Sequence, residues 1–560
     1  MAKLVRMGKW SSLVGILVLL LGQAVQAEEQ KPVLVVSAAS YQKLIDDLAM
    51  LGKLADRPEI GTALEGMLSL ATGGKGLAGL DKNRPVCLVV QTDGQRFTPY
   101  LAIPVSQLEK LLGVVEPLLP KPIVKKDGLY ELSLEGGRKL YVQAKGQDWA
   151  VGVEKAEALA VVPEQIPEEV RQKLPAHWTV GISILAKNIA PEQRRQWADR
   201  LRQQTERELT PRPGETEEDF KVRKWLSEWV TDWAASALDQ VEQVQIGVGV
   251  DKQAESLVLE MAVQPTSGSP LAEAIQKAGE TKTAFGGVLT PEAVLTAHGV
   301  LRYPAGEFHQ IAPLVEMVKV RALQQRPRPN QTPEQAQLQR ELMTAIFDLV
   351  EKTLKSGRAE GALSVVLQPD RFTLLAGAYV ADGRAVETLL DRAVAEAKKV
   401  RPGEVDHYVK LRAEQVQGFN LHVVRIPIPA EAERREALIR LLGAETELVI
   451  GTGPEAMYIA LGKDAQAALR TAIQKDAQGP QKAAPVGASL AIKPVLAVLA
   501  EHGDQVQQEK ARQVLEKMSG KDRLRLAVES AEGRLRLRIE IQQDVLAVMA
   551  LTVLTASGQQ

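Results

Sequence analysis

The sequence predicts an α+β fold in two related halves, each a largely antiparallel sheet with helices packed on one face. Two observations predict it. Runs of alternating apolar and polar residues are joined by short polar turns, which is typical of antiparallel strands with one face against helices and one toward water. The same series of such segments also recurs in order along the chain, which indicates an internal duplication.

The first 27 residues have the pattern of a cleavable signal peptide. Basic residues precede an apolar stretch that ends in LVLLLG, and Val25-Gln26-Ala27 puts small residues at positions −3 and −1 of a cleavage site. The apolar stretch is shorter than the roughly 18 to 20 residues that a membrane span needs. We therefore expect a mature chain that begins near Glu28 and works outside the cytoplasm, in the periplasm or the extracellular space.

Charge and cysteine content narrow the function classes. The chain has 69 basic and 70 acidic residues, and only basic ones fall in segment 1–27, so the mature chain is slightly acidic. Nucleic-acid binding usually shows as a basic excess, so no such partner is expected. The single cysteine, Cys87 in PVCLVV, cannot form an intrachain disulfide and is expected to be buried on a strand. Beyond the leader, the apolar segment Val545–Leu554 is too short to span a membrane and predicts a buried helix.

Three kinds of segment recur along the chain. A strand that leads into a helix begins at Pro32, Trp178, Val294 and Val486. Each is followed by a hairpin and a helix, which begin at Pro85, Val244, Gly361 and Asp522. A unit of three strands and a helix begins at Gly128, and its counterpart begins at His407. Because the order is the same in both halves, we expect two domains that arose by duplication, at 28–283 and 284–560.

Turn and cap signals predict where several elements end. Asp93-Gly94 predicts a hairpin turn between two alternating runs. Thr216 and Thr332, each after a Pro-Arg-Pro turn, are expected to cap the second helix of two long helical insertions. In the last hairpin, Leu and Ile alternate with Arg on both strands, so we expect the Leu/Ile face to lie under helices and the Arg face in water.

Short motifs that suggest catalysis or cofactor binding are better explained as turns, helix starts or chance matches. Gly451–Ala456 matches a dinucleotide fingerprint, but the MYIALG that follows indicates a strand where a helix is required, so a hairpin turn is expected. Ser40-Tyr41-Gln42-Lys43 matches the S-x-x-K nucleophile motif, although the sequence lacks the companion S-D-N and K-T-G motifs. The histidines and the cysteine show no metal-ligand spacing. The sequence therefore predicts no catalytic residue, no cofactor and no metal site.

Two surfaces remain as candidate interaction sites. Trp225, Trp229 and Trp233 lie at i, i+4 and i+8 on one predicted helix, at the border of its apolar arc. Core packing is the favoured interpretation, and a partly exposed groove for a partner or an apolar ligand is the alternative. The second candidate is a row of arginines on the last hairpin, which could bind anions but is expected to be a solvated face with interleaved glutamates. The row consists of Arg523, Arg525, Arg534, Arg536 and Arg538.

The run DKNRPVCLVVQTDGQRFTPYLAIPVSQLEKLL, with the strand–helix–hairpin plan around it, resembles a group of large exported bacterial proteins without an assigned activity. The resemblance implies export and an α+β fold, and it carries over no functional residues. We therefore expect an exported, non-catalytic protein of the periplasm or cell envelope that acts by binding or as a structural component. A carrier of lipid or of another apolar ligand, held between sheet and helices, is the alternative, and an exported hydrolase is the third. The expected partner is an envelope protein or an apolar ligand.

Overall fold

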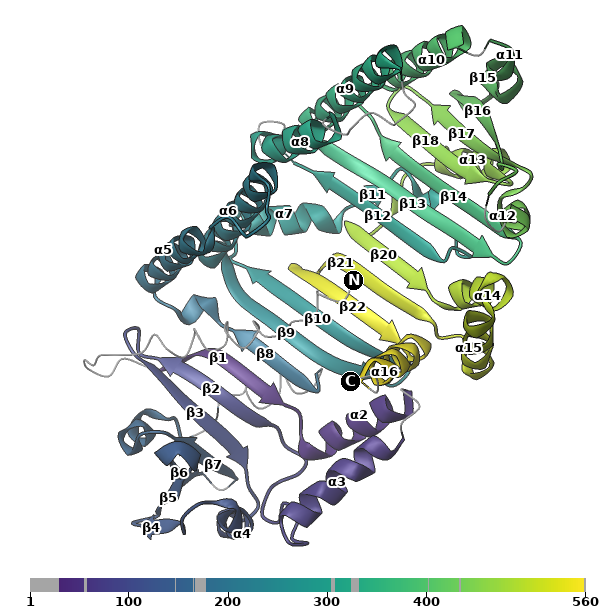
Figure 1. Ribbon diagram of the computed structural model, residues 1–560. Helices are drawn as coiled ribbons and strands as arrows, with labels where there is room; N and C mark the ends of the chain where they lie inside the picture. The colour runs from purple at the N-terminus through teal and green to yellow at the C-terminus, as the bar shows by residue number, and fades with distance from the viewer. Residues whose placement is uncertain are drawn as a thin grey trace. The chain divides into compact units, whose positions relative to one another are not determined.

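A computed structural model describes residues 30–54, 58–146, 148–164, 166, 178–303, 308–323, 332–400, 402–432 and 435–557 (Figure 1). The predicted leader, residues 1–27, lies outside the described residues. Helices and largely antiparallel strands alternate along the chain, so the predicted α+β class is confirmed. The chain divides into two compact units. The first unit is Met1–Arg200, Ala235–Gln253 and Leu257–Ser267, and the second is Leu201–Ala234, Ala254–Ser256 and Gly268–Gln560.

The first unit is built on one sheet of ten strands. The strands from β9 to β4 pair antiparallel with their neighbours, and β10 lies beside β9 at the other end. The order is β10-β9-β8-β1-β2-β3-β7-β6-β5-β4. The strands are β1 (Lys31–Ala38), β2 (Val86–Thr92), β3 (Phe97–Pro104), β4 (Val124–Lys126), β5 (Leu129–Ser133), β6 (Lys139–Lys145), β7 (Trp149–Val153), β8 (Val180–Ile184), β9 (Val241–Asp251) and β10 (Ser256–Pro265). The helices are α2 (Tyr41–Leu54), α3 (Glu59–Ala71) and α4 (Leu108–Val115). Helices α5 (Pro191–Glu208) and α6 (Glu217–Gln240) each have residues in both units.

The second unit is built on an antiparallel sheet of the order β22-β21-β20-β12-β13-β14-β18-β17-β16-β15. Its strands are β12 (Leu295–Arg302), β13 (Arg358–Gln368), β14 (Arg371–Tyr379), β15 (Val409–Val416), β16 (Phe419–Pro427), β17 (Glu445–Thr452), β18 (Ala456–Gly462), β20 (Val486–Ala491), β21 (Arg523–Ala531) and β22 (Arg534–Gln542). A separate two-stranded sheet pairs β11 (Lys282–Thr283) with β19 (Gln481–Lys482).

The helices of the second unit join these strands and, in part, lie beside their ends. They are α7 (Pro270–Gly279), α8 (Phe308–Leu323), α9 (Pro333–Lys355), α10 (Gly383–Val400), α11 (Pro402–Tyr408), α12 (Arg435–Leu442), α13 (Ala465–Asp476), α14 (Lys493–His502), α15 (Gln505–Lys517) and α16 (Gln543–Ser557). Figure 1 shows α12, α14 and α15 beside the ends of the strands. In this view no described helix lies in front of the middle of β12, β13 and β20 (Figure 1).

The strand orders of the two units correspond position by position. Taken in chain order, β1 to β10 of the first unit match β12 to β18 and β20 to β22 of the second, and corresponding strands have corresponding neighbours. This correspondence is what a duplication would produce. The predicted boundaries at 28–283 and 284–560 stay a prediction, because the compact units exchange segments between residues 201 and 268.

Local sequence signals account for several element ends. Asp93 and Gly94 lie in the turn between β2 and β3, where Gly94 has φ 91° and Asp93 Oδ1 accepts a hydrogen bond from the Arg96 N–H at 2.7 Å. Thr332 caps α9 in a capping box with Gln335. Thr216 Oγ1 accepts a hydrogen bond from the Asp219 N–H at 3.1 Å at the start of α6. These predictions are confirmed.

The glycine pattern at Gly451–Ala456 and the unit from Gly128 form different elements. Gly451 and Ala456 lie on β17 and β18, which pair as a hairpin, so the predicted hairpin is confirmed at this glycine pattern. The helix expected at the end of the unit from Gly128 is instead a 3-10 turn, Ala156–Val161. A further short strand, β4, also precedes that unit. The segment from Val545 is helical as predicted, although Met549 is 52% exposed.

The core of the second unit lies between its sheet and α13. Leu469 and Ile473 of α13 are buried in one cluster with Val449 and other strand residues. The 3-10 turn Gly286–Val288 closes this cluster, and Gly287 is required there because a Cβ would lie 2.4 Å from the Ala472 carbonyl oxygen. In the first unit, Cys87 is fully buried on β2 as predicted.

Candidate functional site

The second unit carries a row of apolar side chains on one face of its sheet. Directly paired residues of antiparallel strands point to the same face, so the register identifies the row. Across nine strands, the register gives Val424, Leu448, Leu461, Leu374, Val365, Leu295, Leu490, Leu524 and Ile541. A second row on the same face consists of Ile450, Ile459, Ala376, Leu363, Ala297, Ala488, Leu526 and Ile539. We call these two rows the apolar face.

None of the side chains of the apolar face is buried. Leu490 is 38% exposed, and the neighbouring Val486, paired with Val528 next to the two rows, is 43% exposed. The opposite face of β13 differs, since Ala362, Ser364 and Val366 are all buried. The expectation that helices bury the Leu/Ile face of the last hairpin is met only in part, because on β21 and β22 the side chains of that face are half-buried.

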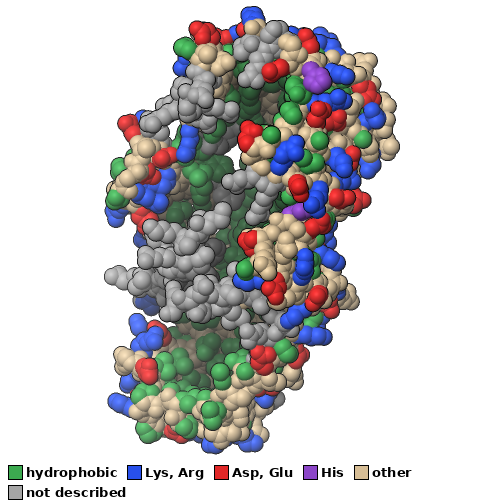
Figure 2. Space-filling view, turned by 45° about the vertical axis from the view of Figure 1, so that its right-hand side comes forward, with side chains coloured by type: hydrophobic (Ala, Val, Ile, Leu, Met, Phe, Trp, Pro, Cys, Tyr) green, Lys and Arg blue, Asp and Glu red, His purple; other side chains and the backbone are tan. Residues whose placement is uncertain are grey.

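The apolar face is unusual for a surface because apolar side chains continue from strand to strand. Contiguous exposed apolar patches on soluble proteins mark sites of interaction with proteins, membranes or apolar ligands. Covering half of one leucine side chain recovers about 1 kcal/mol, so a ligand that covers several positions gains binding free energy from each of them. On the side that it shows, the space-filling view has hydrophobic side chains between charged ones (Figure 2).

The first unit has a comparable row on its own sheet. The register joins Ile246, Ile182, Val36, Leu88 and Leu101 across five strands. Ile246 and Leu88 are 38% and 40% exposed. On the same face, Leu34 and Val90 are buried in a cluster that includes Trp197 of α5. A helix thus covers part of this face in the first unit.

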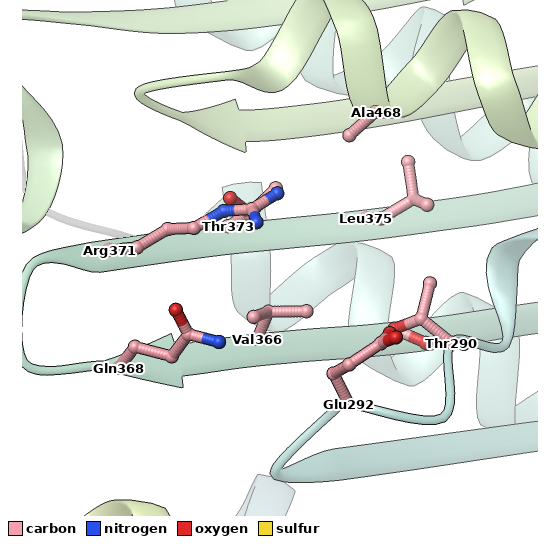
Figure 3. A pocket seen from close by; sticks show the side chains of 9 residues that line it. Thr290, Glu292, Val366, Gln368, Arg371, Thr373, Leu375 and Ala468 are labelled. Carbon is pink, nitrogen blue, oxygen red and sulfur yellow. Dashed lines mark hydrogen bonds between the residues drawn. The ribbon is translucent and has the colours of Figure 1, made fainter.

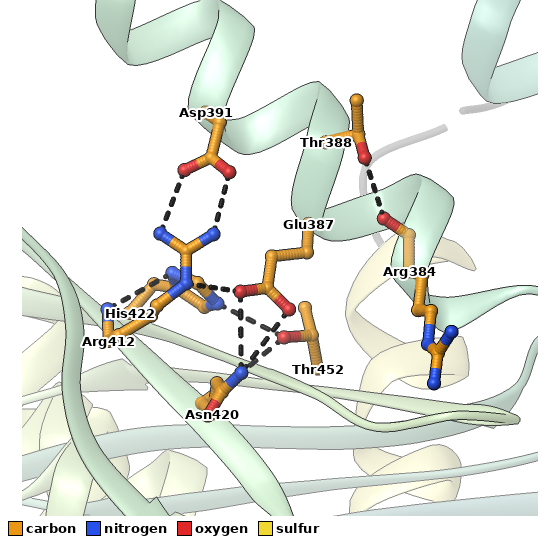
Figure 4. Close-up of polar contacts among 8 residues, drawn as sticks. All are labelled: Arg384, Glu387, Thr388, Asp391, Arg412, Asn420, His422 and Thr452. Carbon is orange, nitrogen blue, oxygen red and sulfur yellow. Dashed lines mark hydrogen bonds and ion pairs between the residues drawn. The ribbon is translucent and has the colours of Figure 1, made fainter.

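At the β15–β17 end of the second unit, α10 covers the apolar side with a polar network (Figure 4). Arg412, with a positive φ of 53°, donates to Asp391 at 2.6 Å and forms an ion pair with Glu387 at 2.5 Å. The hydrogen bond from Arg412 lowers the pKa of Asp391. Asn420 Nδ2 donates to both oxygens of Glu387 at 3.3 Å. These contacts anchor α10 to β15 and β16.

His422 lies fully buried beneath this network. Its Nδ1 accepts a hydrogen bond from the Arg412 N–H at 3.4 Å, so the ring proton sits on Nε2. Nε2 therefore donates to Thr452 Oγ1, 3.0 Å away. A histidine that activates a hydroxyl nucleophile must accept the hydroxyl proton, and here the direction is reversed. The pair is thus arranged as a structural hydrogen bond, and burial lowers the pKa of His422.

The S-x-x-K segment of the first unit also has a structural role. Ser40 Oγ accepts a hydrogen bond from the Lys43 N–H at 3.2 Å, which places Ser40 at the start of α2. Lys43 Nζ forms an ion pair with the buried Asp47 at 2.7 Å, and Thr179 Oγ1 donates to the same carboxylate oxygen at 2.5 Å. An ammonium group held by a carboxylate is poorly suited to act as a general base.

The tryptophan stripe lies on α6. Trp225 is half-buried and its ring stacks on that of Trp229, with centroids 6.2 Å apart. Trp229 is 41% exposed and its neighbours Leu226 and Val230 are 50% and 48% exposed. Core packing, the favoured interpretation of the stripe, is therefore wrong for Trp229, because α6 contacts α5 through another side, where Thr231 is buried. The side chain of Trp233 lies outside the described residues.

The arginine row lies on one face of β21 and β22, as the alternation predicts. Arg525 is paired across the strands with Glu540, and their side chains lie 3.3 Å apart. Arg536 forms an ion pair with Glu532 at 2.9 Å. Arg523 donates to Ser489 Oγ and to the Pro291 carbonyl oxygen. These contacts with acceptors of the chain itself agree with the expected solvated face. Anion binding by Arg534 and Arg538 stays an untested alternative.

The described residues hold neither a metal-binding group nor a helix that could span a membrane. In the part of the chain that the structure describes, no three His, Cys, Asp or Glu side chains gather as a metal-binding group. None of the described helices is long and apolar enough to cross a membrane. Comparisons with protein-family models, with curated proteins and with solved structures found no match for this chain.

Proposed function

We propose that this chain is an exported, non-catalytic binding protein, and that the apolar face of its second unit holds the acyl chain of a lipid or fatty acid. The observation that carries the proposal is the apolar row that runs through Leu295, Leu490 and Leu524, in which Leu490 is exposed and the other two are half-buried. From β14 to β22 the face crosses five strand spacings, or roughly 24 Å. An extended long acyl chain would fit along that distance.

The composition of the face favours an acyl chain over a protein partner. Its two rows contain aliphatic side chains alone, with no hydrogen-bonding group to fix an orientation. Protein interfaces depend on aromatic and arginine side chains and on directed hydrogen bonds. A ligand recognised by apolar area alone requires none of these.

A fluorescence titration with cis-parinaric acid, a fatty acid probe, tests the proposal. We expect saturable binding to the detergent-free protein. In Leu490→Lys the affinity should fall at least tenfold, because the lysine ammonium would lie under the acyl chain. Val506→Lys on α15 is the matched control, since Val506 is 61% exposed and lies off the sheet. Equal affinity of the two variants, or no binding by the natural protein, would overturn the proposal.

Export is tested separately on the intact protein. A mature chain purified from outside the cytoplasm should begin at or near Glu28, as the leader predicts. Secreted material that begins at Met1 would contradict it. The measurement is the intact mass together with N-terminal sequencing.

A further inference from the structure

A cavity of about 270 Å³ lies on the other face of the same sheet, beside β13 and β14. Its walls come from those two strands, from the segment before β12 and from α13 (Figure 3). Val366 and Leu375, both buried, give it an apolar floor. Nothing in the proposed acyl-chain binding uses this cavity, because strand alternation points these side chains away from the apolar face.

Three buried polar atoms without a hydrogen-bond partner line this one cavity. They are Thr290 Oγ1, Thr373 Oγ1 and Arg371 Nε. The Thr373 side chain is the most enclosed, since the residue is only 3% exposed. Buried polar groups in folded proteins are normally hydrogen-bonded, so a concentration of unpaired ones around a cavity points to a molecule that binds there.

The surrounding contacts fix the positions of these groups. Ser364 Oγ donates to the Val288 carbonyl oxygen at 2.6 Å and accepts from the Thr290 N–H at 3.2 Å, which holds Thr290 at one side of the cavity. Figure 3 shows the Arg371 side chain extending along β14 toward Thr373, with Glu292 beside Thr290 on the other side. Arg371 Nε lies 3.6 Å from Asp464, whose side chain is 51% exposed, so solvent weakens that ion pair.

We propose that the cavity binds a small aliphatic carboxylate, with its oxygens on Arg371 and Thr373 and its aliphatic part on Val366 and Leu375. The Nε–H of Arg371 can only donate, and the Thr373 hydroxyl can donate as well, so the ligand must present acceptors. A carboxylate presents acceptors only and matches the planar guanidinium. At the Arg371 side the carboxylate would compete with the partly exposed Asp464 for the guanidinium, and Glu292 at the other side leaves room for an ammonium group.

Saturation-transfer NMR with three probes of the same branched skeleton tests the proposal. The probes are 4-methylpentanoate, leucine and 4-methylpentan-1-ol. We expect 4-methylpentanoate to bind saturably and the alcohol to bind at least tenfold more weakly. Tighter binding of leucine than of 4-methylpentanoate would identify amino acids as the source of the carboxylate, and weaker binding would identify simple carboxylic acids. Equal binding of acid and alcohol would overturn the proposal.

Two variants link binding to the named groups. In Arg371→Gln and Thr373→Val the affinity for 4-methylpentanoate should fall at least tenfold, while the melting temperature of unliganded Thr373→Val should not fall, because the valine removes an unpaired buried hydroxyl. Unchanged affinity in Thr373→Val, or a melting temperature lowered by several degrees, would show that the hydroxyl is satisfied by the protein or by water alone. Leu490→Lys should retain full affinity for this probe, so failure of either proposal can be told from failure of the other.

Discussion

Leu295 of β12 lies directly opposite Leu490 of β20, and both side chains belong to the apolar face of the second unit. The two residues are far apart in the sequence, and each lies in the strand of its own strand–helix segment. Because β12 and β20 are neighbours in the middle of the sheet, the apolar face exists only once these segments have paired. The face is therefore a property of the folded unit, and its exposure can be measured by substitution.

Replacement of Leu490 by alanine should cost little stability. Leu490 is 38% exposed, so we expect Leu490→Ala to lower the free energy of unfolding by about 1 kcal/mol. Leu469 of α13 is fully buried, and Leu469→Ala should cost about 3 kcal/mol. Urea unfolding of both variants provides the measurement. Equal losses would mean that something covers the apolar face in the folded protein.

Mild acid should destabilise the second unit. Burial lowers the pKa of His422, whose ring is also surrounded by the charges of Glu387, Arg412 and Asp391, and burial lowers the pKa of His298. The unfolded chain, with histidine pKa values near 6.5, then binds protons more readily than the folded chain. The free energy of unfolding should therefore fall as the pH drops below about 6.5.

The variant His422→Gln isolates the contribution of one ring. One histidine contributes at most about 1.4 kcal/mol per pH unit to the slope of the free energy of unfolding against pH. Between about pH 6.5 and 5 the slope should be smaller in the variant than in the natural protein, because one depressed pKa has been removed. Parallel curves from urea unfolding at a series of pH values would show that His422 does not titrate as its burial predicts.

Loss of the Glu360 carboxylate should strongly destabilise the second unit. Glu360 is paired with Arg358 at 2.6 Å, its side chain has no exposed surface, and it accepts hydrogen bonds from Thr283 and Ala284. Glu360→Ala leaves these donors unpaired, so we expect a loss on the order of 3 kcal/mol in urea unfolding. Glu351→Ala, which breaks an exposed ion pair with Lys355, should cost less than about 0.5 kcal/mol. Similar losses would mean that Glu360 is solvated.

The thiol of Cys87 should be unreactive in the folded protein. Burial raises the pKa of Cys87 to about 11, and its Sγ lies 3.4 Å from Ser37 Oγ. Because the thiolate is the reactive form, iodoacetamide at about pH 8 should modify the folded protein far more slowly than the unfolded one. Mass spectrometry follows the modification. Comparable rates with and without guanidinium would place Cys87 at the surface.

Local pattern was sufficient to predict most of the fold. Alternation identified β21 and β22, the Asp93-Gly94 turn identified a hairpin, and Thr332 identified the start of α9. Each of these signals acts over a few residues, so no tertiary information was needed. The helix expected after β7 is instead the 3-10 turn Ala156–Val161, which the sequence pattern did not distinguish from an α-helix.

The candidate sites were less predictable because they depend on contacts between distant segments. Alternation showed that Leu524 and Leu526 share a face, but neither that Leu490 lies beside Leu524 nor whether a helix covers that face. The apolar arc of α6 gave no indication that Trp229 would be exposed, since that depends on which side contacts α5. Thr290 and Thr373, which lie far apart in the sequence, became candidates only when the fold placed them around one cavity.

The most direct test of acyl-chain binding is native mass spectrometry of the full mature chain, purified from outside the cytoplasm without detergent. We predict a protein-bound species heavier than the chain by the mass of one or more lipids or fatty acids, which organic extraction removes. The same preparation of Leu490→Lys should lack that species, whereas Val506→Lys should retain it. A bare chain in all three preparations, with no uptake of added long-chain fatty acid, would contradict the account.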